Sequence, residues 1–256
     1  MQISTIVPTP HLDLVKSDPY HLCLVHQLRK RGAYHRFYKE QASMGKFVIV
    51  DNGAAEFEST TMEEVLELTF EIGASELQLP DTFFDADYTL KQGWEALGYL
   101  DGQEYVGSIM AVPQGRNIKE WIQCATELIS WGRIDCLGIP KNVVTLVKEH
   151  DMGRLAAGHH ILYQAHLMGY GTSIHLLGCW NFPTEIGMLY SALGNNIRGV
   201  DSGIAAIYAQ EGLPLKRGNR KPGNNHPVLN FDKRIEDENL LLKNVEAWRR
   251  YCLAEL

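Results

Sequence analysis

Apolar residues in this chain occur in short runs that alternate with longer segments of helical periodicity. Eight runs are rich in β-branched or apolar residues and bounded by turn residues, which is the pattern of buried strands. These runs occupy residues 2–9, 21–28, 46–51, 76–80, 105–115, 134–140, 173–179 and 197–202. Helical patterns between the runs occupy 61–72, 87–97, 118–131, 154–168 and 183–193.

The alternation predicts the fold class. Parallel strands need crossovers of a dozen or more residues, so eight strands separated by helices indicate an α/β protein with a (β/α)₈ TIM barrel. A doubly wound open sheet is the competing architecture, but no GxGxxG follows the first strand. Residues 235–256 form an amphipathic pattern, predicting a C-terminal helix that completes the outer ring. Thr60 or Thr61, with an acid three residues later, predicts a capping box for the helix at 61–72.

Composition narrows the class of protein. With 256 residues, of which 45% are hydrophobic, the chain is long enough for one barrel, so we expect residues 1–256 to form a single domain. No run of about 18 apolar residues occurs and the first twenty residues lack a signal-peptide layout. We therefore expect a soluble cytoplasmic protein that does not contact membranes.

Five cysteines are scattered along the chain without any CxxC spacing. This pattern indicates neither a disulfide framework nor a four-cysteine zinc site. We expect reduced thiols packed as small hydrophobic residues, no metal and no cofactor. The net charge of -7 argues against a generally basic surface, although a local basic patch is compatible with it.

Polar residues stand where several predicted strands end. In a barrel the carboxyl ends of the strands meet around one mouth, where the catalytic groups of such folds are found. Reading each strand to its end collects Asp51, Asp81, Gln114, Leu137 with Gly138, Gly178 with Cys179, and Asp201.

The three aspartates have two interpretations. An aspartate after a strand is often a helix N-cap or a turn residue, and Asp81 in LPDTFFDAD fits that description. Polar groups at the ends of four separate strands favour a functional site instead. In such a site one carboxyl with a raised pKa could serve as acid and base while another stays ionised as a nucleophile.

The segments that carry these residues resemble the tRNA-guanine transglycosylase family. The matching stretches are FVIVDNGAAE, LQLPDTFFDAD, AVPQG, IDCLGIP and IHLLGCWNFPTEIGMLYSALGNNIRGVDS. The most specific part is HLLG, followed by about twenty residues of helical pattern and then GVDS.

The resemblance implies roles for individual residues. Asp201 would be the nucleophile that attacks C1′ of a guanosine nucleotide, and Asp51 the general acid and base. Asp81 would accept from guanine N1 and the exocyclic amine, and Gln114 would address the O6 edge. Further contacts would come from the backbone of Leu137 and Gly138, with Leu177 and Gly178 beside the base.

The chain lacks the Cys-x-Cys-x-x-Cys and histidine zinc site of the tRNA enzymes in this family. It therefore resembles most the phage and bacterial DNA transglycosylases, which replace guanine in DNA with a 7-deazaguanine such as preQ0. The expected partners are DNA and a free 7-deazaguanine base. Two alternatives stay open, namely a tRNA substrate and a barrel subunit that binds nucleic acid or a deazapurine without catalysis.

Several basic residues are candidates for contacts with a nucleic-acid backbone. Arg116 follows Gln114 at the predicted mouth, and a basic loop at 214–227 carries Lys216, Arg217, Arg220 and Lys221. A solvated connector is the alternative for this loop. Arg198 precedes the proposed nucleophile and could instead form a surface ion pair. His175, inside SIHLLG, is predicted to be a core histidine with a hydrogen-bonded ring.

Overall fold

The computed structural model describes residues 1–54, 60–146, 153–178, 183–216 and 229–253. Eight parallel strands form one sheet in the order β1-β8-β7-β6-β5-β4-β3-β2. The strands are β1 Gln2–Thr5, β2 Tyr20–Leu24, β3 Phe47–Asp51, β4 Glu76–Gln78, β5 Ser108–Ala111, β6 Cys136–Pro140, β7 Ser173–Leu177 and β8 Ile197–Ser202.

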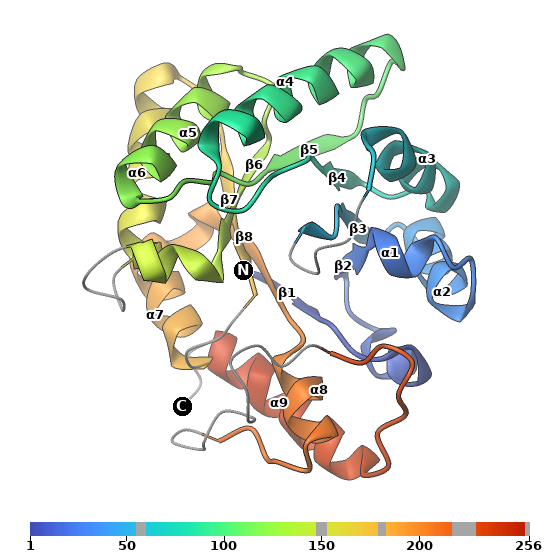
Figure 1. Cartoon of the computed structure of the whole chain (residues 1–256). Coiled ribbons are helices and arrows are strands. Elements are labelled where there is room, and N and C mark those ends of the chain that lie inside the picture. The colour runs from blue at the N-terminus through green and yellow to red at the C-terminus, as the bar shows by residue number, and fades with distance from the viewer. Residues whose placement is uncertain (55–59, 147–152, 179–182, 217–228, 254–256) are drawn as a thin grey trace.

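The sheet curls into a nearly closed barrel (Figure 1). Its two end strands, β1 and β2, are joined by a hydrogen bond in which the Leu22 N–H donates to Ser4 Oγ over 2.8 Å. Strands lie centrally and helices surround them, which confirms the predicted (β/α)₈ architecture.

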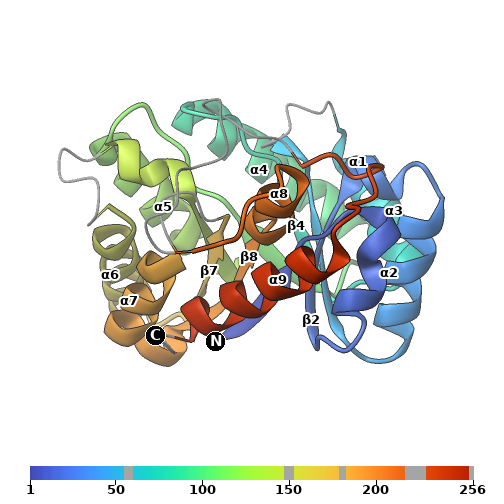
Figure 2. The same ribbon diagram turned by 90° about the horizontal axis from the view of Figure 1, so that it is seen from below.

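The described helices are α1 Val25–Leu28, α2 Ala33–Ser43, α3 Met62–Ile72, α4 Ala86–Gly102, α5 Ile118–Ser130, α6 Gly153–Met168, α7 Pro183–Leu193, α8 Ile204–Gln210 and α9 Glu238–Cys252. Helices α3 to α7 match the five predicted segments, although α4 extends beyond its predicted end, whereas α1, α2 and α8 had not been predicted. Helix α9 packs against α7 and α8 and crosses below the start of β1 (Figure 2), so the C-terminal helix belongs to the outer ring as expected.

The first crossovers differ from the sequence prediction. The apolar run at residues 21–28 is a strand only to Leu24, because Val25 to Leu28 turn into the short helix α1. The connection after β1 contains a 3-10 helix, Thr9–Val15, rather than a full α-helix. Apolar runs of this length do not distinguish a strand from a buried helical turn.

Side-chain caps set the starts of several helices. Thr61 caps α3, because its Oγ1 accepts the Glu64 N–H at 3.2 Å, while Thr60 instead donates to the Asn52 carbonyl. Thr61 is therefore the N-cap, which confirms half of the capping-box prediction, while the Glu64 carboxylate that would complete the box pairs with Arg29 at 3.0 Å. Asp85 caps α4 in the same way by accepting from the Tyr88 N–H.

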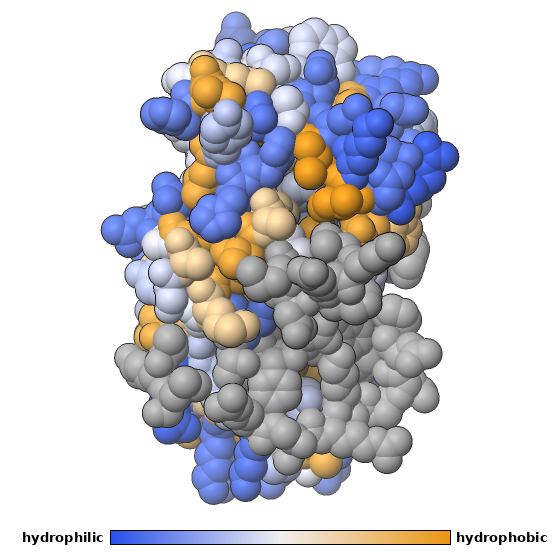
Figure 3. Space-filling model, turned by 90° about the vertical axis from the view of Figure 1, so that its left-hand side faces the viewer, coloured by the Kyte–Doolittle hydropathy of each residue, from blue (hydrophilic) through white to orange (hydrophobic). Residues whose placement is uncertain are grey.

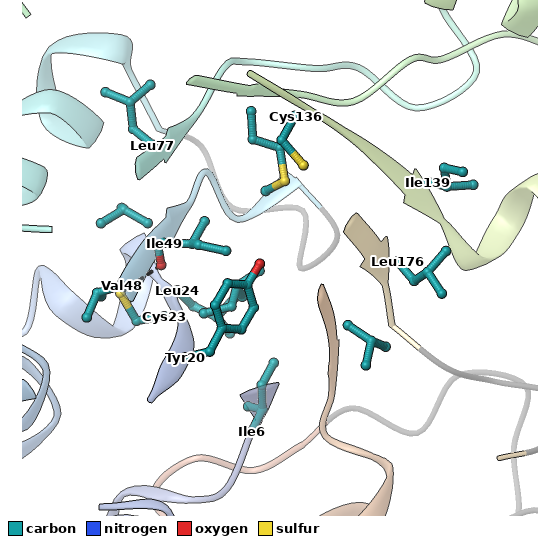
Figure 4. Packing of buried hydrophobic residues seen from close by; sticks show 14 of the residues in the cluster. Ile6, Tyr20, Cys23, Leu24, Val48, Ile49, Leu77, Cys136, Ile139 and Leu176 are labelled. Carbon is teal, nitrogen blue, oxygen red and sulfur yellow. Dashed lines mark hydrogen bonds between the residues drawn. The ribbon is translucent and has the colours of Figure 1, made fainter. Parts of the chain in front are cut away.

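Apolar side chains fill both the barrel interior and the layer between strands and helices. Strands β2 and β6 are buried along their whole length, as expected for parallel strands that are covered on both faces. Ile49, Cys136 and Leu176 surround the interior, and the ring of Tyr20 points from β2 toward the middle of the barrel (Figure 4). Four cysteines, Cys23, Cys124, Cys136 and Cys252, are buried and not disulfide-bonded, whereas Cys179 lies outside the described residues.

The outer surface carries scattered apolar side chains. Figure 3 shows apolar residues among hydrophilic ones on the side of α5, α6 and α7. Exposed examples on α6 and α7 are Tyr163, Leu167 and Met188. Within the described part of the chain, no helix is long and apolar enough to cross a membrane.

Candidate active site

Three predicted carboxylates gather at one end of the barrel. Asp51 is the last residue of β3, Asp201 is the fifth residue of β8, and Asp81 follows β4 by three positions. Asp51 and Asp201 are only 8% and 6% exposed. Because all strands are parallel, these positions share the carboxyl edge, and β3 and β8 are separated around the barrel by β1 and β2. Asp51 and Asp201 therefore approach the mouth from different sides.

One oxygen of Asp201 is held by two donors. His175 Nε2 lies 3.0 Å from Asp201 Oδ1, and the Gly178 N–H donates to the same oxygen at 3.3 Å. No described residue donates to Asp201 Oδ2. The carboxylate is therefore fixed through one oxygen, while the other is available for a ligand.

A buried chain of side chains continues from Asp201 to the opposite end of the barrel. The Tyr20 hydroxyl lies 2.8 Å from His175 Nδ1, and Arg198 Nε donates to the Tyr20 oxygen at 3.3 Å. Arg198 in turn holds Glu76 through two bonds of 2.6 Å. Tyr20 and Glu76 are the first residues of β2 and β4, so this chain runs along the barrel from its amino end to the mouth.

The directions of these bonds assign the histidine tautomer. A carboxylate oxygen accepts, so His175 Nε2 carries the hydrogen that is donated to Asp201. In that tautomer Nδ1 accepts the Tyr20 O–H, while the Tyr20 oxygen accepts from Arg198. Burial raises the pKa of Tyr20 well above its ordinary value, which keeps this phenol protonated. His175 is fully buried with both ring nitrogens bonded, as predicted for a core histidine.

Arg198 is not in a surface ion pair, which corrects one sequence interpretation. Its partner Glu76 is completely buried, and the guanidinium lies 5.1 Å from the centre of the Phe47 ring. The β7–β8 register shifts between Ile174 and His175, leaving Arg198 as an extra residue on β8. Such a bulge re-aims a side chain, here into the barrel interior. Burial raises the pKa of Glu76, although the bonds from Arg198 oppose this shift.

Arg154, which the sequence analysis did not single out, organises the β7 end. Its guanidinium donates to the carbonyls of Ile139, Leu177 and Gly178 over 2.9–3.2 Å, and Glu185 lies 3.8 Å away. Gly178 has φ +65°, a conformation that favours glycine. By fixing this residue's carbonyl, Arg154 helps to aim its N–H at Asp201. An arginine inside a helical pattern offers no sequence signal for such a role.

Asp81 is held by three side-chain amides. Asn52 and Gln78 donate to its Oδ1 at 2.8 and 3.2 Å, and Gln114 donates to Oδ2 at 2.6 Å. Asp81 is therefore not a helix cap, since Asp85 has that role. A carboxylate has about four acceptor positions, so one remains on Oδ2. Burial raises the pKa of Asp81, and the three amides partly offset this shift.

Asn52 and Gln78 also escaped the sequence analysis. Asn52 follows Asp51 directly and additionally donates to the Leu79 carbonyl at 2.7 Å. Gln78 is the last residue of β4 and is almost fully buried. The signal that could have found Gln78 is the alternation along β4, because Glu76 and Gln78 are polar residues two apart in a short buried strand.

The remaining mouth residues occupy the ends of β3, β6 and β7. Asp51 Oδ1 accepts the Gly53 N–H at 2.7 Å, which fixes one oxygen of the predicted acid and base within its own turn. Leu137 is still paired with both neighbouring strands, but Gly138 lies beyond the last β5–β6 pair. A Cβ on Gly138 would approach Leu177 Cδ1 to 2.6 Å, so a larger residue there would displace Leu177.

The predicted backbone-contact residues are only partly described. Arg116 is 74% exposed and pairs with Glu120 at 3.0 Å on the first turn of α5. Lys216 is exposed, whereas Arg217, Arg220 and Lys221 lie outside the described residues. The described part of the basic loop thus tests little of the prediction. Among described residues, no group of three or more histidine, cysteine, aspartate or glutamate side chains is arranged to hold a metal.

Comparisons with known proteins identify the fold. No protein-family model and no curated protein matches the chain. Among solved structures, an HpcH/Hpal aldolase/citrate lyase family protein from Burkholderia cenocepacia J2315 is 10% identical with a TM-score of 0.53, covering 80% of this chain and 88% of its own. The YdjI aldolase from Escherichia coli K12 is 13% identical with a TM-score of 0.51, and the match covers 99% of this chain and 88% of the aldolase.

A mandelate racemase/muconate lactonizing enzyme from Roseiflexus sp. is 15% identical with a TM-score of 0.51. The match covers 78% of this chain but only 54% of the racemase, so the chain spans about half of that protein's length. At these identities the likeness shows the barrel fold alone. The reaction of this protein can therefore be inferred only from the residues of its own site.

Proposed function

We propose that this protein is a base-exchanging glycosyltransferase that replaces guanine in DNA with a 7-deazaguanine through a covalent glycosyl-aspartate. The observation that carries the proposal is the asymmetric environment of Asp201. One oxygen is oriented by His175 and Gly178, and the other receives no hydrogen bond from a described residue. A carboxylate held in this way is suited to form a bond to a sugar carbon.

The reaction divides into two displacements. In the first, Asp201 Oδ2 bonds to C1′ as the C1′–N9 bond of guanine breaks, and the leaving base takes a proton from Asp51. In the second, Asp51 removes the N9 proton of the incoming 7-deazaguanine, whose N9 bonds to C1′ as the C1′–Oδ2 bond breaks. Two inversions retain the configuration, and the polymer stays attached to the enzyme between them.

Asp81 supports the recognition half of the proposal. Its remaining acceptor position would take one hydrogen bond, from guanine N1–H or from the exocyclic amine, and the second hydrogen of the Gln114 amide would address the O6 edge. A base that lacks these matching groups would leave buried polar atoms unpaired, which is the strong form of discrimination. The base must first leave the helical stack to reach the mouth.

The decisive experiment is to incubate the protein with guanine-containing DNA, denature it and look for a stable protein–DNA adduct. We expect an adduct with the wild type and none with Asp201→Asn. Labelled guanine offered with DNA and with tRNA in parallel identifies the polymer. Incorporation into tRNA alone would move the same chemistry to RNA.

A non-catalytic barrel that binds nucleic acid or a deazapurine is the second candidate. The polar cluster around Asp81 favours it as much as it favours the enzyme, because that cluster needs no chemistry. A pure binder retains the free base but incorporates no label. Absence of both adduct and incorporation would refute the enzyme.

A further inference from the structure

Phe84 combines two features that do not help the fold. Its backbone has φ +61°, in the left-handed region that β-carbon-bearing residues rarely adopt. The residue is also 45% exposed, although an aromatic side chain is stabilised by burial. An unfavourable backbone conformation that presents an aromatic ring to solvent points to a use for the ring.

The position of Phe84 connects it with the polar cluster. Its N–H donates to Gln114 Oε1 at 3.4 Å, and the amide of the same Gln114 donates to Asp81 at 2.6 Å. The backbone of Phe84 is thus one hydrogen-bonded residue away from the carboxylate. The neighbouring Phe83 ring lies 6.1 Å from the Phe84 ring, centre to centre, with a tilt of 48°. Two aromatic rings therefore stand in the loop that carries Asp81.

We propose that Phe84 is a stacking residue for the planar purine or deazapurine whose hydrogen-bonding edge is held by Asp81 and Gln114. This inference rests on the proposed function and deepens it by separating edge recognition from face recognition. The polar groups select the base, and the aromatic face adds affinity that depends little on which base is present. The hydrogen bond from Phe84 to Gln114 couples the placement of the ring to the group that reads the edge.

The test is calorimetric titration of the full-length protein with free 7-deazaguanine and, separately, with guanine. Removing one base–aromatic stack corresponds to about a ten-fold loss of affinity, which we expect for Phe84→Ala. Phe84→Tyr and Phe84→Trp should stay close to the wild type because each keeps an aromatic face. Tyr88→Ala is the matched control, since Tyr88 is similarly exposed at 47% on the following helix α4.

Phe84→Gly separates stacking from a structural role. Glycine accepts a positive φ without strain, so the melting temperature of Phe84→Gly should equal or exceed that of Phe84→Ala. The affinity of Phe84→Gly for 7-deazaguanine should stay low because the variant has no ring. Wild-type affinity in Phe84→Ala, or equal losses in Phe84→Ala and Phe84→Tyr, overturns the stacking inference.

Asp81→Asn distinguishes this failure from failure of the proposed function. If Asp81→Asn weakens binding while Phe84→Ala does not, edge recognition stands and the stacking inference is wrong. If the wild type binds neither base, or if Asp81→Asn binds both as well as the wild type does, the proposed function fails and the inference fails with it.

Discussion

Asp201 and Asp81 lie at the same mouth but are held in opposite ways. Asp201 receives two hydrogen bonds on one oxygen, from a histidine and a backbone N–H. Asp81 receives hydrogen bonds on both oxygens, all from side-chain amides, namely those of Asn52, Gln78 and Gln114. Position at a strand end therefore does not decide what a carboxylate does.

The difference fits the different roles that we propose for the two aspartates. A carboxylate that accepts amide hydrogen bonds on both oxygens is a weaker nucleophile and a well-oriented acceptor, which suits recognition. A carboxylate with one open oxygen and one anchored oxygen suits bond formation. The hydrogen-bonded chain that holds Asp201 extends through His175 and Tyr20 to the ion pair of Arg198 with Glu76. Asp81 is held only by the three amides that contact it directly.

Substituting each aspartate with asparagine should give the largest difference between the kinetic effects at the two positions. Asp201→Asn should reduce the rate of base exchange by at least ~10⁴-fold, because loss of a nucleophile removes the covalent route. Asp81→Asn should mainly raise the KM for the incoming base, by roughly 10- to 100-fold, as expected for a lost hydrogen bond to a charged group. Steady-state exchange kinetics separate the two effects. Equal losses of kcat in both variants would erase the distinction.

Arg154→Met tests the outer support of the Asp201 side. The variant leaves three strand-end carbonyls without their donor and Glu185 without its cation. We expect the free energy of unfolding in urea to fall by about 3 kcal/mol. Arg234→Met is the control, because the Arg234–Glu238 pair is exposed and should contribute no more than about 0.5 kcal/mol. In the folded fraction, exchange should slow while affinity for 7-deazaguanine is kept.

The pH dependence of base binding tests the Asp81 side. Burial raises the pKa of Asp81, so its ionised form is lost as pH falls through a value above that of an ordinary aspartate. Affinity for 7-deazaguanine should fall below that pH by up to about ten-fold per unit, and Asp81→Asn should abolish the dependence. The same raised pKa contributes stability at low pH that is lost as pH rises, so binding and stability should change in opposite directions.

The sequence predicted the barrel because the periodicity of apolar residues and the spacing between strands and helices are local properties. It placed Asp51, Asp81 and Asp201 at strand ends, since the carboxyl ends of parallel strands must meet. It did not find Asn52 and Arg154, because these residues acquire their roles only through contacts between residues far apart in the chain. Gln78 is only three residues from Asp81 and was missed although the polar alternation along β4 could have found it. The direction of Arg198 depends on a bulge in the β7–β8 register, which no local pattern encodes.

Tyr20→Phe should have the smallest effect and tests whether the long anchor of Asp201 matters. The variant removes the hydroxyl that donates to His175 Nδ1 and accepts from Arg198, while keeping the ring stacked 5.5 Å from Phe47. His175 is then no longer restricted to the tautomer that donates to Asp201. Loss of one such bond corresponds to about 1 kcal/mol, so we expect kcat for exchange to fall by about five-fold with KM unchanged.

Tyr34→Phe is the matched control, because the Tyr34 hydroxyl is also buried and accepts the Leu24 N–H at 3.1 Å, but belongs to α2 outside the chain that reaches Asp201. Both variants should lose similar stability, since each removes one buried hydroxyl, but only Tyr20→Phe should slow exchange. If both variants slow base exchange equally, the slower exchange comes from a general loss of barrel stability. The difference between Asp201 and Asp81 would then rest on their immediate donors alone.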